Sequence, residues 1–258
     1  MSNVQLSLLG ASSTITPPGD STASLHIEWP GGSWLVDCSG NVPDALREFD
    51  IDYRELNGIV FTHSHPDHTY GLPFLSHAFY SSHHSIDVMA PPETLPRLKD
   101  ALEAYDLREP DRYLECSFEE ISESEQHTLY SGPELQIRSF PNNHSRPGIG
   151  LKLSTNDQEF LFSGDTDLCG NIRKLGHGTD VLIHDCQTTH GYKRYFEGSH
   201  TSALELGKLA SNLQINTLVP FHYNTTEFPP SWQDIAREIR EYYRGTIVKP
   251  TRGMALHL

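Results

Sequence analysis

Short runs of apolar and β-branched residues recur along the chain, separated by turns rich in glycine, proline and polar residues. Runs of about four to eight such residues predict β-strands. They fall into two groups, at residues 4–9, 24–29, 33–37, 58–62 and 86–90, and at residues 134–140, 148–154, 159–163, 181–184 and 217–221. The chain is therefore expected to build two separate runs of sheet.

Apolar residues at helical spacing lie between and after these runs. Leu95, Leu98 and Leu102 share one face of a predicted helix at residues 91–105. Ser202, with Glu205 three residues later, has the capping-box spacing that opens another helix. Further helices are predicted at residues 43–49, 72–80 and 231–243. The pattern predicts an α/β fold with two sheets face to face and helices outside, in a single domain over residues 1–258.

Net charge narrows the range of partners. The chain has 34 acidic and 19 basic residues, a formal net charge of −15. Proteins that bind nucleic acid carry a basic surface, because phosphate contacts supply most of their affinity. A long polyanion is therefore an unfavoured partner, although two bound divalent ions would offset about four negative charges.

Two further features indicate a compartment. The sequence shows neither a basic segment followed by an apolar stretch at its start nor a run of about 18 apolar residues, which argues against a signal peptide and a membrane span. The four cysteines are scattered without a C-x-x-C pair and predict free thiols, with Cys38 and Cys186 as small buried residues. We expect a cytoplasmic protein that does not associate with membranes.

The densest set of metal-binding side chains follows the predicted strand at residues 58–62. His63, His65, Asp67 and His68 lie within six residues, and imidazole and carboxylate are ligands that zinc and similar ions favour. His63 and His65 lie on one side of an extended segment and can share an ion, whereas Asp67 and His68 point elsewhere and suit a second ion. The motif predicts a dinuclear site that needs more ligands.

Three further candidates each follow a predicted strand, where sites in layered α/β folds are built. His144 lies in a loop after residues 134–140, Asp165 follows the apolar run 160–162, and His222 follows residues 217–221. The predicted ligands are His63, His65, Asp67, His68, His144, Asp165 and His222.

The order H-x-H-x-D-H, a distant histidine, S-G-D-T and a late histidine resembles the metallo-β-lactamase fold superfamily over most of the chain. The opening Leu8-Leu9-Gly10-Ala11-Ser12-Ser13, residues 34–40 and Gly71-Leu72-Pro73 resemble its tRNase Z and small phosphodiesterase branch. The resemblance implies an αββα sandwich with two divalent ions, zinc first, with manganese or iron as alternatives.

The resemblance also assigns roles to the ligands. It implies that His63, His65 and His144 hold one ion and that Asp165 bridges both ions. The other ion would be held by Asp67, His68 and His222. Asp67 is in addition the predicted orienting carboxylate of the reaction.

Asp185 and His200 resemble the Glu/His pair of tRNase Z, with aspartate in place of glutamate. The resemblance implies that His200 gives a proton to the leaving oxygen and that Asp185 keeps the imidazole charged and in place. The alternative is that His200 satisfies a helix N-terminus and Asp185 a backbone amide.

Two other features offer substrate contacts. Residues 192–196 interleave aromatic and basic side chains, which could cover a base or a phosphate, although an ordinary surface loop is the alternative. Arg146 is a candidate phosphate contact.

These observations predict a metal-dependent hydrolase, a phosphodiesterase acting on a small phosphodiester or a cyclic nucleotide. tRNA 3′ processing is an alternative, but the long basic arm of tRNase Z enzymes has no counterpart in the short interval at residues 166–184. Hydrolysis of an ester, lactone or thioester at the same metals is another alternative, and a binding or regulatory protein without turnover is a third. The resemblance also suggests a homodimer.

Overall fold

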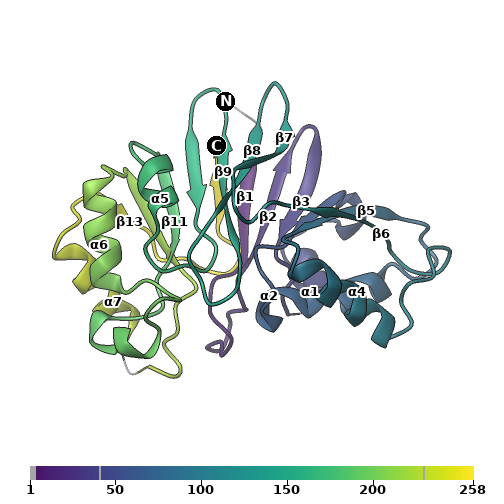
Figure 1. Ribbon diagram of the computed structural model, residues 1–258, viewed down its shortest axis with the longest axis horizontal. Coiled ribbons are helices and arrows are strands. Elements are labelled where there is room, and N and C mark those ends of the chain that lie inside the picture. The colour runs from purple at the N-terminus through teal and green to yellow at the C-terminus, as the bar shows by residue number, and fades with distance from the viewer. Residues whose placement is uncertain (1–3, 41, 229) are drawn as a thin grey trace.

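The computed structural model describes residues 4–40, 42–228 and 230–258, which form two mixed sheets with helices on both outer faces (Figure 1). In spatial order, the first sheet contains β14 (Ala255–His257), β1 (Gln5–Gly10), β2 (Ser24–Trp29), β3 (Gly32–Val36), β4 (Gly58–Val60), β5 (Ser85–Ala90) and β6 (Glu115–Glu120). The second contains β13 (Thr246–Ile247), β12 (Thr217–Phe221), β11 (Val181–Asp185), β10 (Glu159–Phe162), β9 (Ile149–Ser154), β8 (Gln136–Pro141) and β7 (His127–Ser131). The predicted αββα sandwich is confirmed.

The helices form two groups on opposite sides of the sheets (Figure 1). Beside the first sheet lie α1 (Val42–Glu48), α2 (Pro66–Thr69), α3 (Gly71–Ala78) and α4 (Thr94–Ala104), with the 3₁₀ turn η1 (Tyr53–Glu55). Beside the second lie α5 (Gly170–Leu175), α6 (Ala203–Asn212) and α7 (Trp232–Arg240), with the 3₁₀ segment η2 (His190–Tyr195). Each described helix is too short or too polar to cross a membrane.

The apolar residues of the first sheet belong to two different clusters because successive residues of a strand point to opposite faces of the sheet. On β3 and β4, Val36 and Val60 belong to the large cluster that joins the two sheets, whereas Leu35 and Ile59 belong to the cluster under α1, α3 and α4. Strands covered on both faces need apolar residues at every position. This explains why these strands are continuous apolar runs in the sequence.

The acidic segment at residues 115–125 contains β6, which is an edge strand of the first sheet. Charged side chains on an edge discourage pairing with other chains. The pattern does not predict α2, α5, β7, β13 or β14. These elements are very short or, like β7, only partly buried. Such segments contain too few buried apolar residues to show a periodic pattern in the sequence.

The strand ends that build the site carry unusual backbone conformations. Asp37, Gly164 and His222 have φ values of 61°, 59° and 59°. For aspartate and histidine this left-handed conformation is uncommon and costs free energy, and such residues cluster at functional sites. The chain therefore turns sharply at three strand ends, after β3, β10 and β12.

A buried histidine away from these strand ends makes stability depend on pH. His26 on β2 places Nε2 2.8 Å from the Ser33 hydroxyl, and its Nδ1 has no partner among the described residues. Burial lowers the pKa of His26 to about 4. The unfolded chain therefore takes up this proton near pH 6.5, whereas the folded chain does so only near pH 4.

We expect the His26 contribution to stability to be complete above pH 6.5 and to be lost as the pH falls towards 4. Between pH 7 and 5.5 the loss should be about 1 kcal/mol. Urea unfolding at both pH values should show this loss in the wild type and in His177→Phe, an exposed control, but not in His26→Phe. An equal pH dependence in all three proteins would contradict the assignment.

Candidate metal centre and acid–base pair

The metal-binding motif changes conformation in its middle. His63 continues the chain after β4, and His65 is the extended N-cap residue of α2, with φ −67° and ψ 146°. Pro66 opens the helix, a position that suits proline because its missing N–H is not needed there. Asp67 and His68 then lie in the helix itself. The change from extended chain to helix gives the two pairs of side chains different directions.

Three histidines form the first ligand group. Nδ1 of His65 lies 2.9 Å from Nε2 of His63 and 3.1 Å from Nε2 of His144. Two nitrogens bound to one tetrahedral zinc ion lie roughly 3.4 Å apart. The three rings, brought together from β4 and from the loop after β8, therefore have close to the spacing that one ion requires.

Asp67, His68 and His222 form the second ligand group. Their ligand atoms all lie within 4.8 Å of one another. Oδ2 of Asp67 is 3.9 Å from Nε2 of His68 and 3.8 Å from Nε2 of His222. This group joins α2 of the first half of the chain to the end of β12.

Asp165 lies between the two groups. Its Oδ2 is 3.8 Å from Nε2 of His63, 3.3 Å from that of His68 and 3.1 Å from that of His222. Asn142 holds the turn by donating to the carbonyl oxygen of Asp165 at 3.0 Å. The carboxylate thus contacts members of both groups, which is the position of a bridging ligand.

The residues present fit two divalent ions. Among the described residues, Nε2 of His68, both ring nitrogens of His222 and Oδ1 of Asp165 are buried without a hydrogen-bond partner. Leaving buried polar atoms unpaired is costly, so each such atom requires a reason. Nitrogen and carboxylate oxygen ligands in this number suit zinc, and manganese and iron also accept them.

The electrostatics agree with ligand function. Burial lowers the pKa of His65 to about 4 and that of His63 well below its usual value, so both rings are neutral and keep a lone pair. Burial opposes charge on His68 too, but Asp165 and Asp37 outweigh it and raise its pKa well above the usual value. The two carboxylates thus favour positive charge at this position, which a metal ion would supply in place of the proton on His68.

Asp37 supports the second group and was not among the predicted site residues. Its Oδ2 lies 2.7 Å from Nδ1 of His68, and the Thr62 backbone and hydroxyl donate to the same carboxylate at 2.7 and 2.8 Å. A carboxylate on the far nitrogen fixes the ring orientation of a metal-binding histidine. The sequence feature that could have identified Asp37 is its position at the end of the predicted strand at residues 33–37.

Thr14 is a second residue that supports the site and was not among the predicted site residues. Its hydroxyl donates to Oδ2 of Asp67 at 2.8 Å, although 53 residues separate the two. The N-terminal loop after β1 therefore reaches the second ligand group and holds Asp67.

Asp185 and His200 form the pair expected from the sequence. Oδ2 of Asp185 is 2.7 Å from Nδ1 of His200, and the His200 ring stacks on His222 with centroids 5.2 Å apart. Burial alone would lower the pKa of His200, but the Asp185 carboxylate outweighs it and raises the pKa to about 9. A charged imidazole thus lies beside the ligand cluster.

The alternative was that Asp185 binds a backbone amide and that His200 caps a helix, and the structure shows only the first of these contacts. Asp185 does accept a backbone amide, that of Thr166 at 2.8 Å, in addition to binding His200. The N-cap of α6 is Ser202, with a complete capping box, so His200 does not cap that helix. His200 also lies with Asp165 and His222 in a third possible ligand group.

Lys193 fixes the backbone at His200. Its ammonium donates to the carbonyl oxygen of His200 at 2.7 Å and to Oδ1 of Asp167 at 2.6 Å. The other oxygen of Asp167 accepts from the Gly198 amide at 2.8 Å. The loop that carries His200 is thereby joined to the loop that carries Asp165.

The two candidate substrate contacts differ in their surroundings. Arg146 is half exposed and pairs with Glu93 at 3.0 Å, so a phosphate would have to compete with this carboxylate. Tyr192, Tyr195 and Phe196 gather around Phe228, with ring centroids 5.3 to 6.3 Å from it. The aromatic segment is therefore anchored, and it lies next to the acid–base pair.

Comparisons with known proteins agree with this architecture. Ribonuclease Z of Mycobacterium marinum (strain ATCC BAA-535 / M) is 24% identical over 246 residues, which cover 85% of this chain and 86% of the relative. The metallo-β-lactamase fold protein YhfI from Bacillus subtilis has a TM-score of 0.81 at 15% identity, and the short form of human tRNase Z has 0.78 at 17% identity. Each of these two alignments covers 98% of both chains.

The fold and the clustered side chains at its strand ends define a metal-dependent hydrolase of the metallo-β-lactamase fold superfamily, in its ribonuclease Z-like branch. The model of one family, described as anti-Pycsar protein Apyc1, matches residues 4–238. The chain belongs to this family.

Proposed function

We propose that the protein hydrolyses a small phosphodiester and that a cyclic nucleotide is its leading substrate class. The observation that carries this proposal is the Asp185–His200 pair beside the ligand cluster. The pKa of His200, about 9, keeps the ring protonated at neutral pH. An alkoxide leaving group needs such a proton, whereas the thiolate of a thioester scarcely does.

The metal ligands keep the roles predicted above in this proposal. His63, His65 and His144 would hold one ion, Asp67, His68 and His222 would hold the other, and Asp165 would contribute to both. When bound, two divalent ions lower the pKa of a water to roughly 7 and neutralise charge on a phosphoryl oxygen. Asp67, fixed by the Thr14 hydroxyl, is the carboxylate that orients the attacking group.

Two features support a small substrate over tRNA. The interval at residues 166–184 contains only a short loop, the six-residue helix α5 and the start of β11, so it holds no long arm. The net charge of −15 opposes binding of a long polyanion. A small phosphodiester needs neither an arm nor a basic surface.

A substrate panel tests the proposal. We expect turnover of bis(4-nitrophenyl) phosphate and of a 3′,5′-cyclic nucleotide, lost on chelation and restored by zinc or manganese. A lactone, a thioester and a precursor tRNA should be cleaved more slowly. Efficient cleavage of the precursor tRNA at its 3′ side, or faster thioester hydrolysis, would show that the substrate class is wrong.

The aromatic surface formed by Tyr192, Tyr195 and Phe228 is the proposed contact for a base. Phe196 links it to the site, because its ring centroid lies 6.4 Å from that of His200. Tyr195 is 62% exposed, so part of its ring is open to a ligand. Stacking of a base on an aromatic side chain contributes about 1–3 kcal/mol.

We therefore expect the double variant Tyr192→Ala/Tyr195→Ala to raise KM for a cyclic nucleotide about 5- to 150-fold. Hydrolysis of methyl 4-nitrophenyl phosphate, which has no base, should change less than about twofold. Tyr242→Ala removes another exposed tyrosine and serves as the control. Equal losses on both substrates would assign these tyrosines to loop folding instead.

A further inference from the structure

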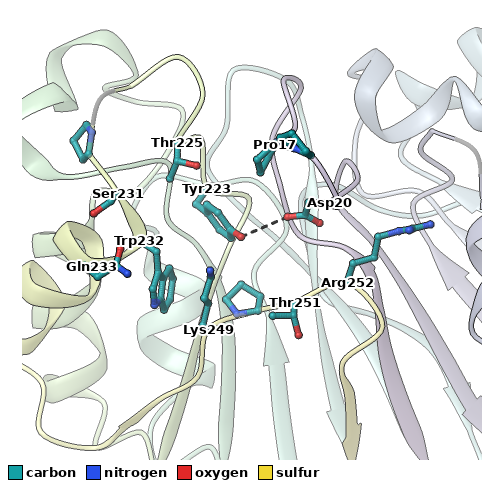
Figure 2. A pocket seen from close by; sticks show the side chains of 14 residues that line it. Pro17, Asp20, Tyr223, Thr225, Ser231, Trp232, Gln233, Lys249, Thr251 and Arg252 are labelled. Atoms are coloured by element: carbon teal, nitrogen blue, oxygen red, sulfur yellow. Dashed lines mark hydrogen bonds between the residues drawn. The ribbon is translucent and has the colours of Figure 1, made fainter.

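A cavity of about 540 Å³ lies outside the metal site. Four segments line it, namely residues 17–20 of the N-terminal loop, 223–225 after β12, the start of α7 and residues 249–252 (Figure 2). Small-molecule sites have volumes of about 300–1,000 Å³. The cavity is therefore large enough for a ligand of nucleotide size.

Its lining combines apolar walls with one available cation. The rings of Tyr223 and Trp232 lie 5.9 Å apart, and Pro17, Pro18, Pro230 and Pro250 add apolar surface. Figure 2 shows the Lys249 side chain pointing into the cavity beside Trp232 and towards Tyr223. In the part of the chain that the structure describes, the Lys249 ammonium forms no hydrogen bond or ion pair.

The other charged groups of the lining are already engaged. Asp20 accepts from the Ser12 hydroxyl at 2.6 Å, from the Ser21 amide at 2.8 Å and, more weakly, from the Tyr223 hydroxyl at 3.5 Å. The Arg252 guanidinium pairs with Glu48 at 2.7 Å, outside the cavity. Lys249 is thus the charge left for a ligand, and a ligand that pairs with it must be an anion.

We propose that this cavity binds a nucleoside monophosphate, with its phosphate on Lys249 and its base against Trp232. An aromatic wall beside a single cation fits a flat base joined to one phosphate better than it fits a simple ion. Thr225 and Gln233 supply donors and acceptors for the ribose or the base. This proposal does not rest on the substrate proposed above.

The cavity is connected to the second ligand group by short contacts. Tyr223 directly follows His222, whose amide donates to the Ala11 carbonyl at 2.8 Å. The same N-terminal loop carries Thr14, which holds Asp67, and residues 17–20, which line the cavity. A ligand that orders these walls therefore also restrains Asp67 and His222, and we expect it to strengthen metal retention.

Calorimetric titration of the metal-loaded enzyme with AMP tests the site. We expect saturable binding that Lys249→Gln weakens at least tenfold and that Lys174→Gln, at an exposed lysine of α5 outside the cavity, leaves unchanged. Trp232→Leu should weaken it as well, and adenosine or inorganic phosphate alone should bind less tightly than AMP. AMP that binds as a product at the metals would still bind to Lys249→Gln. Identical AMP binding in all variants would therefore show that AMP does not use the cavity and would overturn the proposal.

Zinc release to a chromogenic chelator tests the coupling between the sites. Saturating AMP should slow release at least about fivefold in the wild type and in Lys174→Gln, but not in Lys249→Gln. Equal release with and without AMP would overturn the coupling. Both measurements are independent of turnover, so an absence of phosphodiesterase activity would contradict the proposed function without deciding this one.

Discussion

Replacing Asp165 with alanine is expected to release both metal ions and to reduce hydrolysis at least about 10³-fold. The reason is geometric, because Oδ2 of Asp165 lies within 3.8 Å of histidines from both ligand groups. It is also electrostatic. Interactions with the neighbouring imidazoles of His222 and His68 outweigh burial and hold the pKa of this carboxyl well below its usual range, so it stays anionic. Its removal would take away a negative charge that lies close to both ligand groups.

Metal content, measured by mass spectrometry on purified proteins, provides the direct test. We expect about two ions per chain in the wild type and in Asp157→Ala, an exposed aspartate control. His65→Ala should lose at least the ion of its own group, whereas Asp165→Ala should lose both. Full metal content and full turnover in Asp165→Ala would show that this residue is not a bridge.

The clustering of the candidate ligands could be predicted because each of them has a recognisable place in the sequence. His63, His65, Asp67 and His68 have a spacing with a geometric meaning, and Asp165 and His222 each follow an apolar strand. Parallel strands align their carboxyl ends, so such residues meet in space without any knowledge of the loops. The structure brings all seven predicted ligands together for this reason.

The supporting contacts could not be predicted in the same way. Thr14 and Asp67 are 53 residues apart, and Lys193 reaches Asp167 from 26 residues away. A lone threonine or lysine in a loop has no periodicity, and its partner depends on how the loops close over the strand ends. Asp37 could be predicted only in part. The strand that it ends was predicted, but its positive φ and its contact with His68 were not.

His200→Ala is expected to lower kcat by about 10²- to 10⁴-fold on a substrate with an alkoxide leaving group. The loss should be much smaller with a 4-nitrophenolate, which departs without a proton. The pKa of about 9 keeps His200 charged below that pH, so wild-type activity on the poor leaving group should fall only as the pH rises through about 9. Asp185→Asn removes the carboxylate that raises this pKa, and the fall should then begin at lower pH.

Rates measured across leaving groups of different pKa, with metal content determined in parallel, separate proton donation from metal binding. His200 lies in a possible ligand group with Asp165 and His222, so loss of an ion from His200→Ala would identify it as a ligand. Retained metals with equal losses on good and poor leaving groups would assign His200 to structure, because a proton donor matters in proportion to the basicity of the group that leaves. We expect His200→Ala to retain its metals and to lose activity only on poor leaving groups, and we expect the pH profile of Asp185→Asn to shift to lower pH. The reason is that Asp185 binds Nδ1 of His200, so only Nε2 is left to give the proton.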